Sequence, residues 1–183
     1  MKKLIWTILI TAVCWGLYPV FPASAATQKT PTIAVVLLGS LEFRDLNYYD
    51  LATESLQKKF PTDKYNLFVG DYPQQLFNRF SDKQGLLPGD TPTEEKLVQF
   101  AWSHSFTEVI FLLLTAPTIK STEITIQWEN PEVTFTARAL RFDARSRKKL
   151  ADVTTTQTAK TLTRKAAKNA AFKKCMDSLQ SQL

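Results

Sequence analysis

The chain has 183 residues, 44% of them hydrophobic, and its 23 Lys and Arg outnumber its 17 Asp and Glu to give a formal net charge of +6. This length and apolar content suit one domain with a true hydrophobic core. One histidine and two cysteines are too few for a zinc site built from these residues, and the five glycines form no phosphate-binding motif, so the composition argues against the common metal and nucleotide sites.

The first 25 residues have the layout of a secretory signal peptide. Residues 1–3 form a short positive head, residues 4–21 are mostly apolar, and Ala23 and Ala25 form an A-x-A cleavage site. We therefore predict cleavage after Ala25 and an exported chain, periplasmic or extracellular and soluble after cleavage.

Two alternatives for this leader stay open. Residues 4–21 are long enough to remain as an N-terminal membrane anchor, and Cys14 could carry a lipid, although Val13 stands where a lipidation signal has a small residue. If Cys14 leaves with the leader, Cys175 is the one remaining cysteine, so no internal disulfide forms. The apolar residues near Cys175 have helical spacing, which predicts that its thiol is buried and inert.

The first half of the domain alternates strands and helices. Two wholly apolar runs predict buried central strands, and Thr-Pro-Thr-Glu before an apolar stripe predicts a capped helix. In order we expect a flexible lead-in, a strand, a helix, a strand, a short helix, a turn-rich loop, the capped helix and a strand, over residues 26–32, 33–38, 46–60, 65–69, 72–80, 81–91, 92–102 and 109–114.

The second half is a meander closed by a helix. Strict alternation predicts a half-buried strand over residues 124–128. In the next strand, residues 133–142, the apolar positions change parity at Leu140, which predicts a bulge near Ala139. A charged turn, a Thr-rich strand and a long Ala-rich helix follow over residues 143–148, 150–158 and 162–180.

The element order is β-α-β-α-α-β-β-β-β-α, which predicts a single α/β (α+β) domain over residues 33–183. We expect a mixed parallel and antiparallel sheet of about five to six strands, with helices packed mainly on one face.

This order resembles a group of bacterial envelope domains: the amino-terminal domain of TolB, the penicillin-binding-protein activator LpoB and the periplasmic part of the curli channel CsgG. The turn after residue 143 lacks the Thr-Gly pair common in that group, and there is no lipidation signal like those of LpoB and CsgG. The resemblance implies a non-enzymatic interaction domain and transfers no functional residue. It is carried by residues 33–38, 56–60, 65–69, 97–102, 106–112, 137–143 and 166–179.

Charge is divided unevenly along the chain. Residues 26–137 hold nine Lys and Arg against 14 Asp and Glu, whereas residues 138–183 hold 12 against three. Such a division can mark an anionic partner, such as an envelope polymer or lipid headgroups, or simply the solvated faces of a hairpin and a helix. The candidate residues are Arg138, Arg141, Arg145, Arg147, Lys148 and Lys149 on the hairpin and Lys165 and Lys168 on the last helix.

A second candidate surface is the turn-rich loop, where the adjacent Leu86 and Leu87 either dock a partner or fold back on the core. Trp102 and Trp128 fit core positions and are interpreted as packing residues. His104 ends a predicted helix, which suits a capping or surface role.

No residue pattern predicts a catalytic, cofactor or metal site, so we predict that the chain is not an enzyme. The sequence favours an envelope interaction module that binds an unidentified envelope protein. The alternatives are an accessory factor for an anionic glycan or lipid surface and, more remotely, a secreted hydrolase. We expect no nucleic acid and no metal among its partners.

Overall fold

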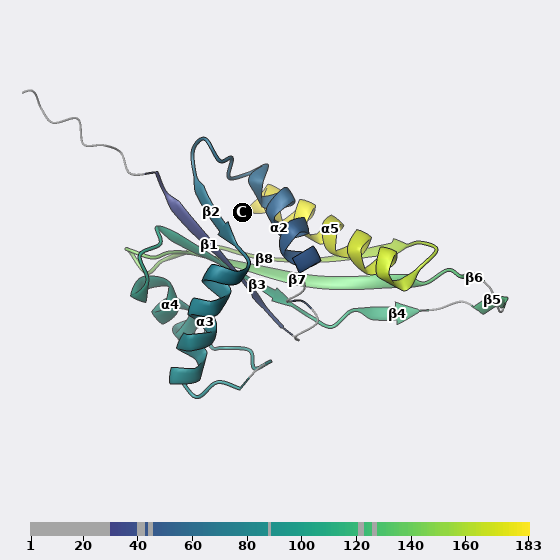
Figure 1. Cartoon of the computed structure of the whole chain (residues 1–183), viewed down its shortest axis with the longest axis horizontal. Helices are drawn as coiled ribbons and strands as arrows, with labels where there is room; N and C mark the ends of the chain where they lie inside the picture. Colours follow the sequence, from purple (N-terminus) through teal and green to yellow (C-terminus); the bar gives the residue numbers. More distant parts are fainter. Residues whose placement is uncertain (1–29, 40–42, 44–45, 88, 121–122, 126–127) are drawn as a thin grey trace, which may run out of the picture.

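The computed structural model describes residues 30–39, 43, 46–87, 89–120, 123–125 and 128–183 (Figure 1). The predicted leader, with its cleavage residues Ala23 and Ala25, lies outside the described residues. Among the described residues, no helix is both long enough and apolar enough to cross a bilayer. The elements are β1 (Thr32–Leu38), α2 (Leu46–Gln57), β2 (Asn66–Val69), α3 (Asp71–Lys83), α4 (Glu94–Ser103), β3 (Glu108–Leu114), β4 (Thr118–Lys120), β5 (Glu123–Thr125), β6 (Trp128–Glu129), β7 (Glu132–Asp143), β8 (Lys149–Lys160) and α5 (Arg164–Gln182).

Six of these strands form one mixed sheet, which confirms the predicted α/β fold. Its order is β2-β1-β3-β7-β4, and β8 pairs with the other edge of β7. β1 lies parallel to both β2 and β3, and β7 is antiparallel to β3, β4 and β8. The long β7–β8 hairpin gives the molecule its length (Figure 1).

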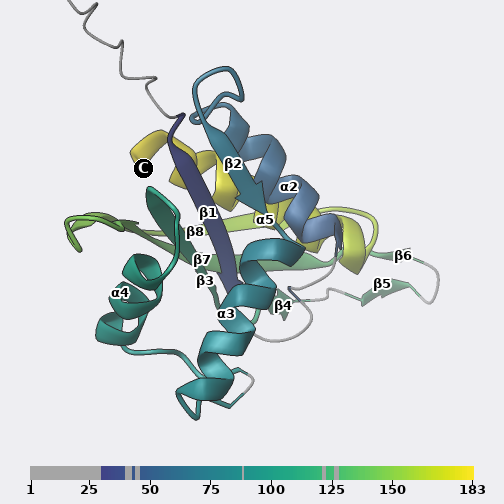
Figure 2. The same cartoon turned by 60° about the vertical axis from the view of Figure 1, so that its left-hand side comes forward.

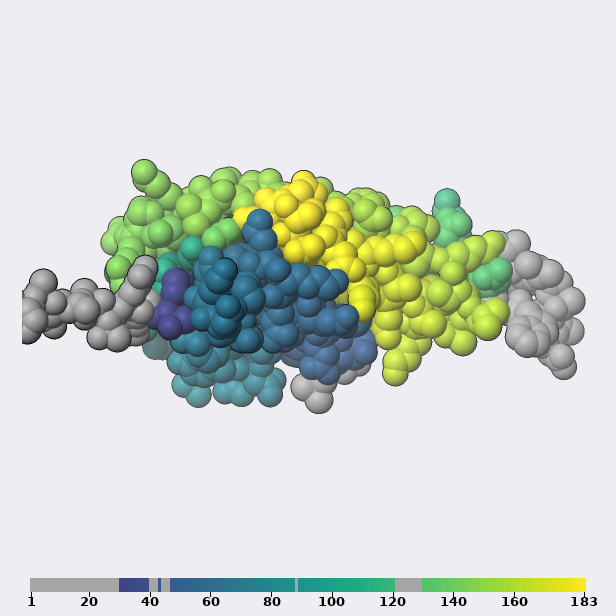
Figure 3. Space-filling view, turned by 90° about the horizontal axis from the view of Figure 1, so that it is seen from above, coloured from purple at the N-terminus to yellow at the C-terminus, as the bar shows by residue number. Residues whose placement is uncertain are grey.

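Helices cover both faces of this sheet. α2 and α5 lie side by side over one face (Figure 3), where Ile33, Val35 and Leu37 of β1 are buried. α3 and α4 cover the other face, where Ala34 and Val36 are buried with Phe77 and Phe100. We expected the helices to pack mainly on one face, but only α2 and α5 share a face, and α3 and α4 pack on the other. Since β1 is apolar at every position after Thr32, each of its faces needs a covering helix.

The parity change in β7 has a different cause from the predicted bulge. Ala137 and Ala139 face α5, whereas Leu140 and Phe142 are buried with the α3–α4 cluster. The pairing of β7 with β3 stays regular across Ala139. The register shift lies between Arg141 and Phe142, in the pairing with β8. β7 thus changes from one covered face to two, without a bulge at Ala139.

The predicted strand over residues 124–128 is not part of the main sheet. β5 and β6 pair with each other as a separate two-stranded sheet, and β4 pairs with the start of β7 instead. Alternation reveals a pleated segment, but it does not reveal whether the partner strand is local or distant.

Cys175 is a fully buried residue of α5, as predicted, and its thiol donates to the carbonyl of Phe135 in β7 at 3.3 Å. Burial raises the pKa of this thiol to about 11. The thiolate needed for reaction is therefore scarce at neutral pH.

Candidate functional site

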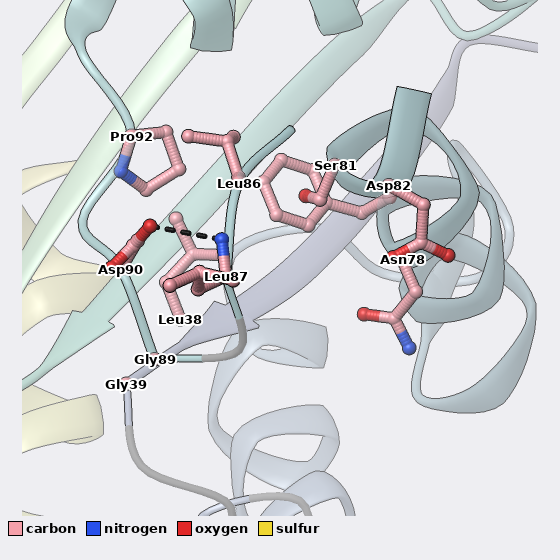
Figure 4. Close-up of a pocket in the computed structure, with 11 residues that line it drawn as sticks. Leu38, Gly39, Asn78, Ser81, Asp82, Leu86, Leu87, Gly89, Asp90 and Pro92 are labelled. Atoms are coloured by element: carbon pink, nitrogen blue, oxygen red, sulfur yellow. Dashed lines mark hydrogen bonds between the residues drawn. The ribbon is translucent and has the colours of Figure 1, made fainter. Parts of the chain in front are cut away.

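A groove lies between α3, the end of β1 and the loop that joins α3 to α4 (Figure 4). Its volume is about 260 Å³. Apolar and polar groups share its walls, which are formed by Leu38, Gly39, Phe77, Asn78, Ser81, Asp82, Leu86, Leu87, Gly89, Asp90 and Pro92. The sequence singled out the two leucines, and the structure places both on this groove.

Hydrogen bonds hold the loop of the groove in place. The Leu86 N–H donates to the carbonyl of Ser81 at 3.0 Å, and the Leu87 N–H donates to Oδ2 of Asp90 at 2.9 Å. The Asp90 N–H in turn donates to the carbonyl of Leu87 at 3.0 Å. Leu86 is partly buried, but Leu87 is 72% exposed. Each of the two alternatives for this pair therefore describes one leucine. Leu86 is partly buried against the domain, whereas Leu87 projects into solvent.

The floor of the groove depends on a close approach of two strands. Gly39 follows β1 with a φ of +139°, and a Cβ there would lie 2.5 Å from the carbonyl oxygen of Leu114. Behind it, the buried Gln74 of α3 accepts a hydrogen bond from the Leu37 N–H at 3.1 Å. β2 ends opposite Val35, so Gln74 replaces a strand as the partner of β1 and fixes α3 against the sheet.

Three of the predicted basic residues are engaged in ion pairs within the fold. Arg138 makes two hydrogen bonds of 2.7 Å to Asp152, which hold the pKa of that carboxyl down at about 2. Lys149 lies 3.0 Å from Glu94 and 3.1 Å from Asp152.

Arg141 is half-buried, 2.6 Å from Glu108, and it also donates to the carbonyl of Leu183 and lies over the ring of Phe60. These side chains link β3, α4 and the carboxyl end of α5 to the β7–β8 hairpin. We assign Arg138, Arg141 and Lys149 to the architecture of the fold.

The other candidates separate into two groups. Arg145, Arg147 and Lys148 are exposed on the turn between β7 and β8. Lys165 and Lys168 lie at the start of α5, beyond the far end of the same hairpin. A strand of twelve residues is about 40 Å long. The structure therefore does not bring the hairpin turn and the helix together into one basic surface.

Trp102 is a residue that the sequence assigned to packing, and this interpretation is wrong in part. Its side chain is 47% exposed, and the guanidinium of Arg147 lies 4.3 Å from its ring centre. Both residues line a pocket of about 460 Å³ together with His104, Phe106, Thr107 and Arg145. The long sequence separation between the two elements hides this contact, since α4 and the turn meet only in the folded domain.

His104 ends α4 as expected. It is the C-cap residue, and its Nδ1 lies 3.0 Å from the carbonyl of Phe100, close enough for an N–H there to donate. Within the described part of the chain, no group of three or more His, Cys, Asp or Glu could hold a metal ion.

No protein-family model and no curated protein matches the sequence. Similar solved structures include lipoprotein GNA1162 from Neisseria meningitidis, with 16% identity and a TM-score of 0.46 over 84% of this chain and 99% of that one. The hypothetical protein CT253 from Chlamydia trachomatis has 14% identity and a TM-score of 0.43 over 84% and 97%. The LpoB C-terminal domain from Escherichia coli has 17% identity and a TM-score of 0.34 over 69% and 82%.

These similar structures include a bacterial lipoprotein and an LpoB domain. At such identities and TM-scores we draw no functional conclusion from them.

Proposed function

We propose that this chain is an exported, non-enzymatic interaction module that binds a protein partner of the cell envelope. The observation that carries the proposal is Leu87, a large apolar side chain 72% exposed at the rim of the groove. Two hydrogen bonds with Asp90 hold the backbone of this leucine in the loop, which lowers the cost of ordering it on binding.

The groove and Leu87 suit a protein surface because they offer complementary features side by side. A partner could cover Leu87 and place one apolar side chain between Leu38, Phe77 and Pro92. Burying a leucine contributes about 1.5–3 kcal/mol, while Asp82 and Asp90 at the rim provide polar groups for hydrogen bonds. An apolar centre with a polar rim is the usual anatomy of such an interface.

Site-specific photocrosslinking in intact cells tests this proposal. A photoreactive amino acid at position 87 is expected to trap one envelope protein, and Leu87→Asp is expected to abolish its binding. Leu162 is a matched control because it is 69% exposed and lies in the connection between β8 and α5, away from the groove. Equal trapping from positions 87 and 162, or a Leu87→Asp variant that binds normally, would contradict the assignment.

Export is tested separately by the mass of the protein recovered from cells. The proposal expects a chain that begins at residue 26, or a full-length chain held in the membrane by residues 4–21. A full-length chain recovered from the cytosol would exclude both forms.

A further inference from the structure

We propose that one end of the domain is a docking surface for anionic phospholipid headgroups. The surface, called here the basic tip, consists of Trp102, Arg145, Arg147 and Lys148. It is separate from the groove and reaches beyond the proposed function, since its partner is a membrane surface and not a protein.

The basic tip lies where the chain enters the domain. The Thr107 N–H donates to the carbonyl of Thr32 at 2.8 Å, and the Ala144 N–H donates to the carbonyl of Thr107 at 3.0 Å. The first residues of β1, the connection after α4 and the β7–β8 turn are therefore joined directly. Figures 2 and 3 show the start of β1 and the β7–β8 turn on the same side of the molecule, with the start of α5 at the far end.

The cations of the basic tip are the ones that the fold does not use in ion pairs. Arg138, Arg141 and Lys149 each lie within 4.0 Å of a carboxylate. Among the described residues, the three cations of the basic tip form no such ion pair. Asp143 is the nearby acid of the turn. Its carboxylate accepts the Ser146 N–H at 2.6 Å, which with the field of Arg145 lowers its pKa. Three cations against one carboxylate leave the tip positive.

Arg147 occupies a backbone conformation that favours glycine. Its φ is +58°, and among the described residues it is the one non-glycine with a positive φ. A side chain in this region costs stability that a glycine would not. The arginine nevertheless stands here, with its guanidinium 4.3 Å from the ring centre of the half-exposed Trp102. An indole beside a cation suits the boundary between acyl chains and headgroups, because one part is apolar and the other charged.

The position of the basic tip along the chain favours a membrane as its partner. The apolar residues 4–21 precede the domain, and the ten residues 22–31 reach at most about 35 Å. If residues 4–21 are kept as a membrane anchor, this connection holds the basic tip within about 35 Å of the bilayer. Basic residues close to an anionic bilayer each contribute about 1 kcal/mol, which is about fivefold in affinity.

Cosedimentation with vesicles tests the inference on the purified chain of residues 26–183. Vesicles of phosphatidylglycerol and phosphatidylcholine should bind the protein, and vesicles of phosphatidylcholine alone should not. Arg145→Ala, Arg147→Ala and Lys148→Ala combined should weaken binding about a hundredfold. The matched control removes three exposed cations from the far end, Lys120, Lys160 and Lys165, and should change binding less than threefold.

Two further variants separate binding from folding. Arg147→Gly should weaken vesicle binding about fivefold while the melting temperature stays the same or rises, since glycine adopts the φ of +58° without strain. Leu87→Asp should bind vesicles normally, so failure of the groove and failure of the basic tip remain distinguishable.

Equal losses from the tip and the far-end triple variants would overturn the proposal, as would binding to phosphatidylcholine alone. Tight binding to soluble dextran sulfate without binding to anionic vesicles would assign the tip to a polymer and also overturn it.

Discussion

Replacing Gln74 by leucine should destabilise the domain and loosen the groove. Oε1 of Gln74 accepts the Leu37 N–H at 3.1 Å, and the two residues are 4% and 1% exposed. Leucine keeps most of the volume but removes the acceptor, so a buried N–H would lose its partner where water cannot replace it. Leaving such a donor unpaired costs about 1–3 kcal/mol.

Urea denaturation measures this cost. With a typical dependence of about 2 kcal/mol per molar urea, a loss of about 2 kcal/mol lowers the midpoint by about 1 M. The neighbouring Gln75 is exposed and supplies the control, because Gln75→Leu should change the free energy of unfolding by less than about 0.5 kcal/mol. If the two variants had the same stability, Gln74 would not be the polar link between α3 and β1 that we describe.

Two other substitutions test the close approach of the ends of β1 and β3 beneath the groove and the charge network of the hairpin. In urea denaturation, Gly39→Ala should lower the free energy of unfolding by more than Gly85→Ala. Both glycines have a positive φ, but a Cβ on Gly39 would lie 2.5 Å from the carbonyl oxygen of Leu114, whereas a Cβ on Gly85 would contact nothing within 4 Å. Asp152→Asn should cost about 0.5–1 kcal/mol at pH 7, a small value because its partner Arg138 is 43% exposed. Since folding lowers the pKa of Asp152 from 3.8 to about 2, its contribution is fully present above pH 4 and is lost as the pH falls through 2. Unfolding curves of the two proteins that stayed equally far apart down to pH 2 would contradict this assignment.

The central strands and most helices were predictable because their signals are local. After their first residues, Thr32 and Glu108, β1 and β3 are continuous apolar runs, and the sequence predicted both within one residue of their observed bounds. The same runs contained the information that both sheet faces are covered. A strand that is half-exposed needs apolar residues at alternate positions only, whereas β1 buries Ala34 and Val36 as thoroughly as Ile33 and Val35.

The error at Ala139 shows what a period of two cannot distinguish. A bulge and a change in the number of covered faces both bring two adjacent apolar residues into a strand. Here α4 covers only the last part of β7, so Leu140 and Phe142 are buried on a face that is open at Thr134 and Thr136. The hydroxyls of those threonines pair at 2.9 Å with Thr158 and Thr156 of β8, which accounts for the Thr-rich sequence of the returning strand.

The basic residues were the hardest part of the candidate site to interpret, because their number in the sequence says nothing about their partners. In the sequence, the paired and the unpaired cations of the hairpin look alike. In the structure, Asp152 neutralises Arg138, Glu108 neutralises Arg141 and Glu94 neutralises Lys149. Two of these carboxylates, Glu108 and Glu94, come from the acidic half of the chain. The contrast between an acidic first half and a basic second half therefore reflects, in part, charges that meet once the domain folds.

What remains after this pairing is smaller and better defined than the predicted surface. The excess of positive charge falls on the turn at one end of the β7–β8 hairpin and on Lys165 of α5 at the other. An anionic surface that needed both groups at once would have to extend about 40 Å along the hairpin. A bilayer that contacts one end of the hairpin touches only one of these two groups. The end with Trp102 and the start of β1 is the one that combines charge, an exposed indole and the point where the chain follows on from the predicted leader.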